Sequence, residues 1–164
     1  MRYVKWIGVI LSIMWFSFVD KDSIFSGYGV GDKAPLFTLS TTNEEGHTLA
    51  LSELKGEYVL LSFWASYDAD SRMKNVQLSK AIANVPEANI KMISISFDEF
   101  RSVYSETIKM DQIDPTMSFV ETKGEKSSLY KQYRLKKGFR NYLLNPEGII
   151  IAKDVNPHDI VEYL

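Results

Sequence analysis

The chain has 164 residues, a formal net charge of −2 and no cysteine. The lack of cysteine excludes disulfides, thiolate nucleophiles and cysteine ligands for metals or haem within this chain. With 45% hydrophobic and 24% charged residues, the composition is ordinary for one folded domain with a core. Since 19 basic residues are matched by 21 acidic ones, the composition gives no indication of nucleic-acid binding, which depends on clustered positive charge.

The first 26 residues differ in pattern from the rest of the chain. Arg2 and Lys5 precede a run of 14 residues without a charge, from Trp6 to Val19. A membrane-spanning helix needs about 20 apolar residues, whereas the core of an export signal needs about 7–15. We therefore predict that residues 1–26 are a signal peptide or an N-terminal membrane anchor, with a buried N-terminal helix as the alternative. The domain proper then spans residues 27–164.

The first half of this domain indicates two short strands followed by a strand–helix unit. Residues 37–40 and 48–51 are strand-like on either side of a turn at 43–46, and residues 52–56 suggest one helical turn ended by glycine. The nearly continuous apolar run YVLLSFW at 58–64 predicts a central strand that is covered on both faces. Residues 68–85 then have apolar side chains at helical spacing, ended by Pro86.

The second half continues the alternation of strands and helices. We predict strands at 90–97 and 116–120, helices at 99–110 and 125–135, a hairpin of 142–144 with 149–152 around the turn NPEG, and a last helix at 157–164 capped by Asn156. Strands that alternate with helices favour an α/β fold, with a sheet covered by helices on both faces. The hairpin makes this sheet mixed rather than purely parallel.

Several segments, taken in order, resemble proteins of the thioredoxin fold. They are VGDKAPLFTL at 30–39, LSELKGEYVLL at 51–61, FWAS at 63–66 and NPEGIIIAK at 145–153. The chain is most similar to bacterial TlpA-like thiol–disulfide oxidoreductases and to alkyl hydroperoxide reductase/thiol-specific antioxidant domains. The resemblance spans about 125 residues and implies a thioredoxin-like three-layer α/β/α fold with a mixed central sheet. It also implies export, either to the periplasm or anchored in the membrane and facing the periplasm.

The segment that carries the chemistry of these families is altered. After FWAS they have an aromatic residue and two cysteines separated by two residues, whereas this chain has Tyr67, Asp68 at the first cysteine position and Ser71 at the second, followed by Arg72. The proline that faces this site in the families is also replaced, by Phe139 or Arg140. A cis bond before a residue other than proline costs about 3–4 kcal/mol, so we expect a trans bond there.

Neither replacement can carry thiol chemistry. Thiol–disulfide exchange needs thiolate attack on sulfur, and peroxide reduction passes through a sulfenic acid. Asp68 and Ser71 have no sulfur. We expect Asp68 or Asp70 to serve as an N-cap, because the start of a helix favours a carboxylate. As an alternative, Asp68 forms an ion pair with Arg140 across the former redox site.

Other kinds of site receive less support from the sequence. Asp68 and Asp70 could bind a divalent metal with Asp98 or Glu99, but no calcium loop or zinc spacing is present, so we expect no metal and take Asp98-Glu99 as a solvated strand end. Serine hydrolysis needs a positioned base, and both histidines lie in polar segments. A lysine-rich segment could attract an acidic partner, but we expect it to be a solvated helix face. It comprises Lys131, Arg134, Lys136 and Lys137.

From these observations we predict a redox-inactive thioredoxin-like domain that acts as a polypeptide-binding or scaffold module, without catalytic residues and without a cofactor. The expected binding residues are Trp64, Tyr67, Asp70, Arg72, Phe139 and Arg140. We expect no nucleic-acid partner, and membrane contact only through the N-terminal segment. The alternatives are an oxidoreductase or antioxidant role by family name only, and an enzyme that reuses Asp68, Asp70 and Ser71 for chemistry without thiols.

Overall fold

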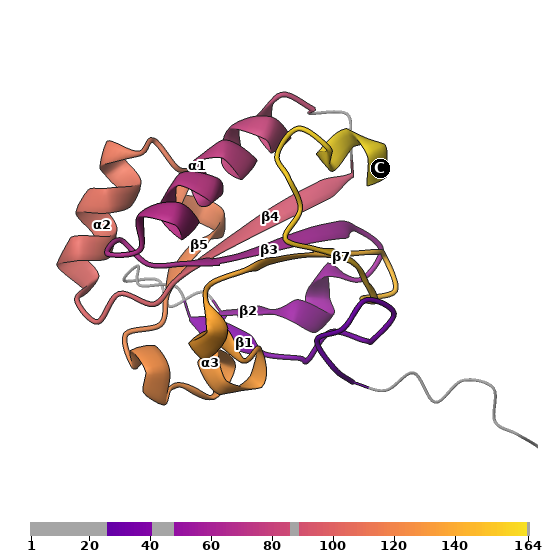
Figure 1. Ribbon diagram of the computed structural model, residues 1–164, viewed down its shortest axis with the longest axis horizontal. Coiled ribbons are helices and arrows are strands. Elements are labelled where there is room, and N and C mark those ends of the chain that lie inside the picture. The colour runs from indigo at the N-terminus through magenta and orange to yellow at the C-terminus, as the bar shows by residue number, and fades with distance from the viewer. Residues whose placement is uncertain (1–25, 41–47, 86–88, 164) are drawn as a thin grey trace, which may run out of the picture.

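A computed structural model describes residues 26–40, 48–85 and 89–163, and its chain forms two sheets with helices around the larger one (Figure 1). The smaller sheet pairs β1 (Thr38–Ser40) with β2 (Thr48–Ala50) in antiparallel fashion. The larger sheet has the strand order β5-β4-β3-β6-β7. Its strands are β3 (Tyr58–Trp64), β4 (Ile90–Ser96), β5 (Ser118–Val120), β6 (Asn141–Leu144) and β7 (Ile150–Lys153).

The large sheet is mixed, as the sequence predicts. β3 runs parallel to β4, with Tyr58 opposite Ile90, and β4 runs parallel to β5. β6 is antiparallel to both β3 and β7. The carboxyl ends of the three parallel strands therefore meet at one edge of the sheet, which is where ligand sites in open α/β sheets form.

Helices cover both faces, so the expected three-layer arrangement is confirmed. α1 (Ala69–Ala83) and α2 (Arg101–Met110) lie on one face, and α3 (Ser128–Gln132) lies with the β1–β2 pair on the other (Figure 1). Because side chains alternate along a strand, Leu61 and Phe63 of β3 enter the core beneath α3, while Leu60 and Trp64 enter the cores beneath α1 and α2.

Two predicted helices are wrong in extent. The segment 125–135 breaks into α3 flanked by 3₁₀ turns at Gly124–Lys126 and Leu135–Lys137. The first break occurs because extended Ser127 caps α3, accepting a hydrogen bond from the N–H of Tyr130 on its Oγ at 3.0 Å. The second occurs at Arg134, whose φ of 53° is left-handed.

The predicted terminal helix is also shorter than expected. Asn156 does accept a hydrogen bond from the N–H of His158 on its Oδ1, at 3.1 Å, but this closes only a turn. Regular structure begins at the 3₁₀ segment Ile160–Tyr163, where Ile160 enters the core.

Another 3₁₀ segment, Leu51–Leu54, forms the predicted turn before Gly56. The turn at 43–46 and the helix stop at Pro86 lie outside the described residues, as do residues 1–25 of the predicted leader.

Candidate functional site

The first turn of α1 is built by the two residues that replace the cysteines. Asp68 is the N-cap, and its Oδ1 accepts a hydrogen bond from the backbone N–H of Ser71 at 2.8 Å. The Ser71 hydroxyl donates in return to the backbone carbonyl of Asp68 at 3.2 Å. The expected capping role of Asp68 is thus confirmed, while Asp70 lies exposed in the first turn, where the helix dipole favours its charge.

Among the described residues, Ser71 is not paired with a histidine base. Ser71 is only 8% exposed, and its hydroxyl is used inside the turn. His158 lines a shallow pocket with Asn84 and Val85 at the far end of α1, so it cannot serve Ser71 as a base, and His47 lies outside the described residues. Within the described part of the chain, no group of three or more His, Asp or Glu residues could hold a metal ion.

Arg72 connects the start of α1 to the end of α2. Its Nε and Nη2 each lie 2.7 Å from a carboxylate oxygen of Asp111, the residue that ends α2. This two-point ion pair is the geometry in which arginine recognises a carboxylate most strongly, and the Asp111 hydrogen bond raises the pKa of the Arg72 guanidinium. The charge that we expected to meet a partner is therefore already engaged in holding α1 against α2.

The alternative ion pair between Asp68 and Arg140 is wrong. Arg140 Nη1 lies 2.7 Å from Asp154 Oδ2 instead, with both side chains about two-fifths exposed. The strand register explains the exchange, because Arg140 directly precedes β6 and Asp154 directly follows the antiparallel strand β7. The Arg140 carbonyl also accepts a hydrogen bond from the N–H of Phe63 at 3.0 Å. The expected trans bond is consistent with the described residues, which contain no cis peptide bond.

Aromatic side chains connect the turn that carries Asp68 and Ser71 to the core beneath α3. The ring of Tyr67 lies 6.3 Å from that of Phe139, which stacks on Phe97 at 5.8 Å and meets Tyr130 edge-on. Phe139 is half-buried, whereas Tyr67 is 71% exposed. This places Tyr67 as the outermost ring of a rigid aromatic series.

Tyr67 also forms one wall of an open cleft. The other walls come from the end of β4, the start of α2 and the loop after β5, and Phe100 and Val103 there are 68% and 42% exposed. Burial raises the pKa of the Tyr67 hydroxyl, and nearby carboxylates, Asp98 first among them, raise it further. The residues lining the cleft are Ser66, Tyr67, Phe97, Asp98, Glu99, Phe100, Val103, Thr122, Lys123, Gly124, Glu125 and Lys126.

Trp64 does not take part in this cleft, so its expected role in an exposed groove is wrong. Its side chain is fully buried against Tyr104 and Ile108 of α2. The indole N–H donates to Ser94 Oγ at 2.8 Å, and that hydroxyl donates to Asn75 Oδ1 at 3.0 Å. Trp64 therefore ties β3 to β4 and α1, and Phe100 and Val103 supply the exposed apolar surface that the sequence analysis missed.

Asp98 corrects a second expectation, because it is not a solvated strand end. It is 3% exposed, and its carboxylate accepts hydrogen bonds from the Ser66 N–H at 3.1 Å, the Ser66 hydroxyl at 2.6 Å and the Ser96 hydroxyl at 2.6 Å. Three donors satisfy a carboxylate that has no cationic partner among the described residues. Asp98 thereby fixes the loop that carries Tyr67 and Asp68. The one hint of this burial in the sequence is Ser96, a hydrogen-bond donor two residues before Asp98. Glu99 is exposed, as expected.

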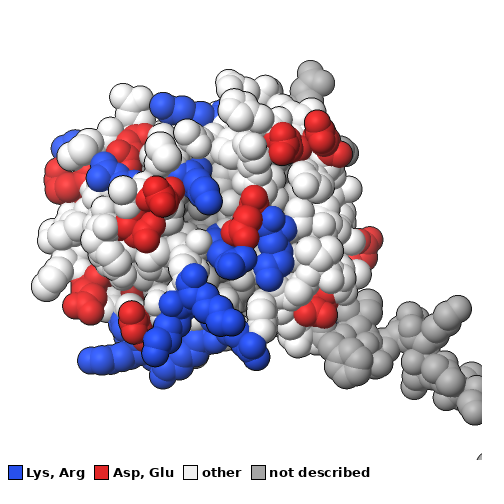
Figure 2. Space-filling model, viewed as in Figure 1, with Lys and Arg blue, Asp and Glu red and all other residues white. Residues whose placement is uncertain are grey.

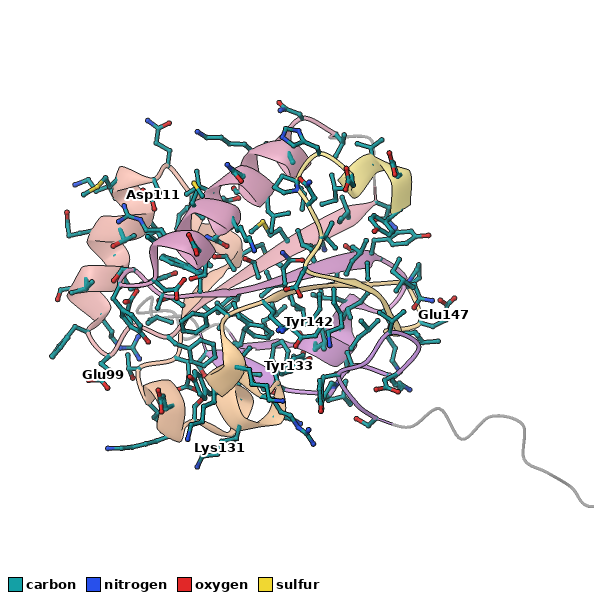
Figure 3. All side chains as sticks on the ribbon, in the orientation of Figure 1. Glu99, Asp111, Lys131, Tyr133, Tyr142 and Glu147 are labelled. Carbon is teal, nitrogen blue, oxygen red and sulfur yellow. The ribbon has the colours of Figure 1, made fainter. Side chains whose placement is uncertain are left out.

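Figure 3 shows Glu99 and Asp111 on the side of the molecule where α2 lies, and Tyr133 and Tyr142 between the sheet and α3. The Tyr133 hydroxyl donates to the Pro35 carbonyl at 2.9 Å, and burial raises the pKa of that hydroxyl.

No helix in the described residues has both the length and the apolar character needed to cross a bilayer.

Comparison with known proteins supports the fold and the lineage. Residues 30–153 match the sequence model of the AhpC/TSA family. The thiol-disulfide oxidoreductase ResA of Oceanobacillus iheyensis is 31% identical over 126 residues, which cover 75% of this chain and 63% of ResA, so the match spans less than two thirds of that relative.

Solved structures agree with this result. A thioredoxin-like protein of Parabacteroides distasonis is 41% identical with a TM-score of 0.72, covering 85% of this chain and 96% of the other. A thiol-disulfide oxidoreductase of Bacteroides fragilis is 30% identical with a TM-score of 0.68, covering 81% and 100%. The expected thioredoxin-like fold is confirmed.

Proposed function

Since the chain belongs to the AhpC/TSA family of thioredoxin-like proteins and yet has no cysteine, we propose that it is a redox-inactive domain of the cell envelope that binds a polypeptide partner. The observation that carries the proposal is that the turn at the two expected cysteine positions lies beside exposed apolar side chains. Asp68 and Ser71 hydrogen-bond to each other, while Tyr67 projects into solvent from the same turn.

The redox-inactive part of the proposal follows from which atoms are present. A mixed disulfide or a sulfenic acid needs a cysteine sulfur, and this chain supplies none. The carboxylate of Asp68 satisfies the helix start that would otherwise stabilise a thiolate. Position 68 therefore still holds a negative charge at the start of α1, but this charge stabilises the helix instead of reacting.

The polypeptide-binding part is supported by the exposed apolar side chains of the cleft. Tyr67, Phe100 and Val103 come from two different elements and line the same hollow. Exposed apolar side chains grouped in this way mark interaction sites more often than isolated ones do. Phe139 backs Tyr67 from within, so the ring can contact a partner without a large loss of conformational freedom.

The binding test uses peptides selected from a random library displayed on phage, with affinities then measured by titration of synthetic peptides. The double variant Tyr67→Ala/Phe100→Ala should weaken binding tenfold or more, which corresponds to about 1.4 kcal/mol. The matched control Val30→Ala/Val161→Ala removes two exposed apolar side chains that do not line the cleft and should leave the affinity unchanged. Equal losses in both variants would mean that the cleft is not the binding surface.

The redox test is a disulfide-reduction assay with insulin and a peroxidase assay on protein free of contaminating reductases. Both should show no turnover above buffer. The envelope part is tested separately with an export reporter fused after residue 26 and by cell fractionation. Recovery of the protein in the cytoplasm would contradict the location without affecting the binding result.

A further inference from the structure

A basic surface, made of Lys131, Arg134, Lys136 and Lys137, lies on the opposite side of the sheet from α1. These residues belong to α3 and the turn that follows it, and all four are exposed. The sequence has no acidic residue between Lys126 and Glu147. Figure 2 shows basic side chains gathered over this region, and Figure 3 shows Lys131 at its outer edge. In a chain of net charge −2, this is a marked separation of charge.

The charges of this surface are mostly not neutralised by neighbours. None of the four residues forms an ion pair with a described acid, whereas nearby Arg140 is paired with Asp154. Arg134 instead lies over the ring of Tyr28, with its Cζ 4.5 Å from the ring centroid, and Lys153 approaches the same ring at 5.3 Å. Cations held this way keep their positive charge available to an anionic surface.

The contact with Tyr28 places the start of the domain beside the basic surface. Tyr28 lies nine positions after Val19, the last residue of the uncharged N-terminal run. An extended chain covers at most about 3.6 Å per residue, so this run ends within roughly 30 Å of the basic surface. At 14 residues the run is shorter than the roughly 20 that span a bilayer, and attraction between a basic surface and anionic lipids strengthens the binding of an element that lies at a membrane.

We propose that the basic surface lies against the anionic headgroups of the membrane in which residues 6–19 are held. Membrane contact would then extend beyond the N-terminal segment to the domain itself. Headgroups suit this surface better than an acidic polypeptide does, because it offers no large exposed apolar side chain: Leu135 is buried, and the exposed ones of the described residues lie elsewhere.

The test places the full chain in vesicles and measures the reactivity of individual lysines with a membrane-impermeant amine reagent by mass spectrometry. One set of vesicles is phosphatidylcholine alone, and the other is an equal mixture with phosphatidylglycerol. Lys131, Lys136 and Lys137 should react several-fold more slowly in the anionic vesicles, and high salt should restore their reactivity. The exposed Lys55 and Lys109, which lie outside this surface, serve as internal controls and should not change.

The variant Lys136→Gln/Lys137→Gln alters only exposed side chains. It tests whether Lys131 is protected because the surface is positively charged or only because the tethered domain lies close to the membrane. In this variant the several-fold protection of Lys131 should be largely lost, because each basic residue near an anionic surface contributes about fivefold in affinity. Equal protection in both kinds of vesicle, no protection in either, or failure of the chain to associate with vesicles would each overturn the proposal. Protection by polyglutamate but not by phosphatidylglycerol would also overturn it and assign the surface to an acidic polypeptide.

Discussion

The Oδ1 atom of Asp68 lies 2.8 Å from the backbone nitrogen of Ser71, so the residues at the two cysteine positions are joined by a helix-capping hydrogen bond. The Ser71 hydroxyl completes the turn by donating to the Asp68 carbonyl. A helix start offers unpaired N–H groups and a partial positive charge, both of which a carboxylate satisfies. The segment in which the family resemblance places two cysteines is therefore a capped helix terminus here.

The first prediction concerns the stability of this cap. Asp68→Ala should lower the free energy of unfolding by about 0.5–2 kcal/mol, because the N–H of Ser71 loses its acceptor. Asp68→Asn should recover most of the loss, since an amide oxygen also accepts the bond. Urea unfolding of both variants measures the effect. Asp70→Ala is the control, as this exposed residue interacts with the helix dipole only, and a loss equal to that of Asp68→Ala would contradict the capping role.

The second prediction is that thiol chemistry can be restored at these positions. The double variant Asp68→Cys/Ser71→Cys should form a disulfide within the chain on mild oxidation, because the hydrogen bond between residues 68 and 71 shows that they are adjacent. Counting of free thiols and mass spectrometry of the intact protein detect the bond. Each single variant should keep one free thiol. Failure of the double variant to oxidise would show that the turn no longer has the geometry of the redox family.

The third prediction separates the observed ion pair from the one that was expected. A double-mutant cycle with Arg140→Ala and Asp154→Ala should give a coupling energy of about 0.2–1 kcal/mol, the range of exposed pairs. The charge reversals Asp68→Arg and Arg140→Asp should show no coupling beyond the error of the measurement. Chemical denaturation of the four variants in each cycle provides the values. A larger coupling between residues 68 and 140 than between 140 and 154 would contradict the structure.

The sequence was sufficient for the features that depend on local pattern. The continuous apolar run at 58–64 predicts β3 with both bounds, and Asp68 before a helical pattern predicts the start of α1. Both signals lie within a few residues and are not altered by the rest of the fold. The helix predicted at 125–135 shows the limit of such signals, because its periodicity does not reveal that Arg134 adopts a left-handed conformation.

Features that depend on distant segments could not be predicted. Trp64 is buried because α2, which follows about forty residues later, covers its face of β3. Arg140 pairs with Asp154 because of the β6–β7 register, and Asp98 is buried because Ser66 comes to it from the end of a neighbouring parallel strand. Each of these outcomes is decided by tertiary contacts rather than by residue type or spacing.

The fourth prediction tests the burial of Trp64. In a variant with Trp6→Phe and Trp15→Phe, Trp64 is the only indole, and its fluorescence should be blue-shifted and resist quenching by acrylamide. Ser94→Ala should cost about 1–3 kcal/mol in unfolding free energy, because it leaves the buried Trp64 N–H without its acceptor. Ready quenching of Trp64 would contradict its burial. The exposed Ser105→Ala variant serves as the control and should be nearly neutral.

The last prediction concerns alkaline pH. Burial raises the pKa of the Tyr104 and Tyr133 hydroxyls above about 10, the value of tyrosine in an unfolded chain. The folded state then retains protons that the unfolded state releases, so the stabilisation is fully present below pH about 10 and decreases as the pH rises above it. Each such tyrosine should contribute a slope of up to about 1.4 kcal/mol per pH unit to the free energy of unfolding.

The contribution of Tyr104 alone is measured by urea unfolding of the wild-type chain and of Tyr104→Phe between pH 9 and 11. The contributions of lysines and other tyrosines cancel in the difference between the two unfolding free energies. Tyr104→Phe should therefore show a shallower decline, whatever its stability at neutral pH. Ser105→Ala, a change at an adjacent exposed position of the same helix, should keep the wild-type slope. If Tyr104→Phe and the wild-type chain lose stability in parallel, the Tyr104 hydroxyl ionises as easily in the folded state as in the unfolded one, and its burial beneath Trp64 would be refuted.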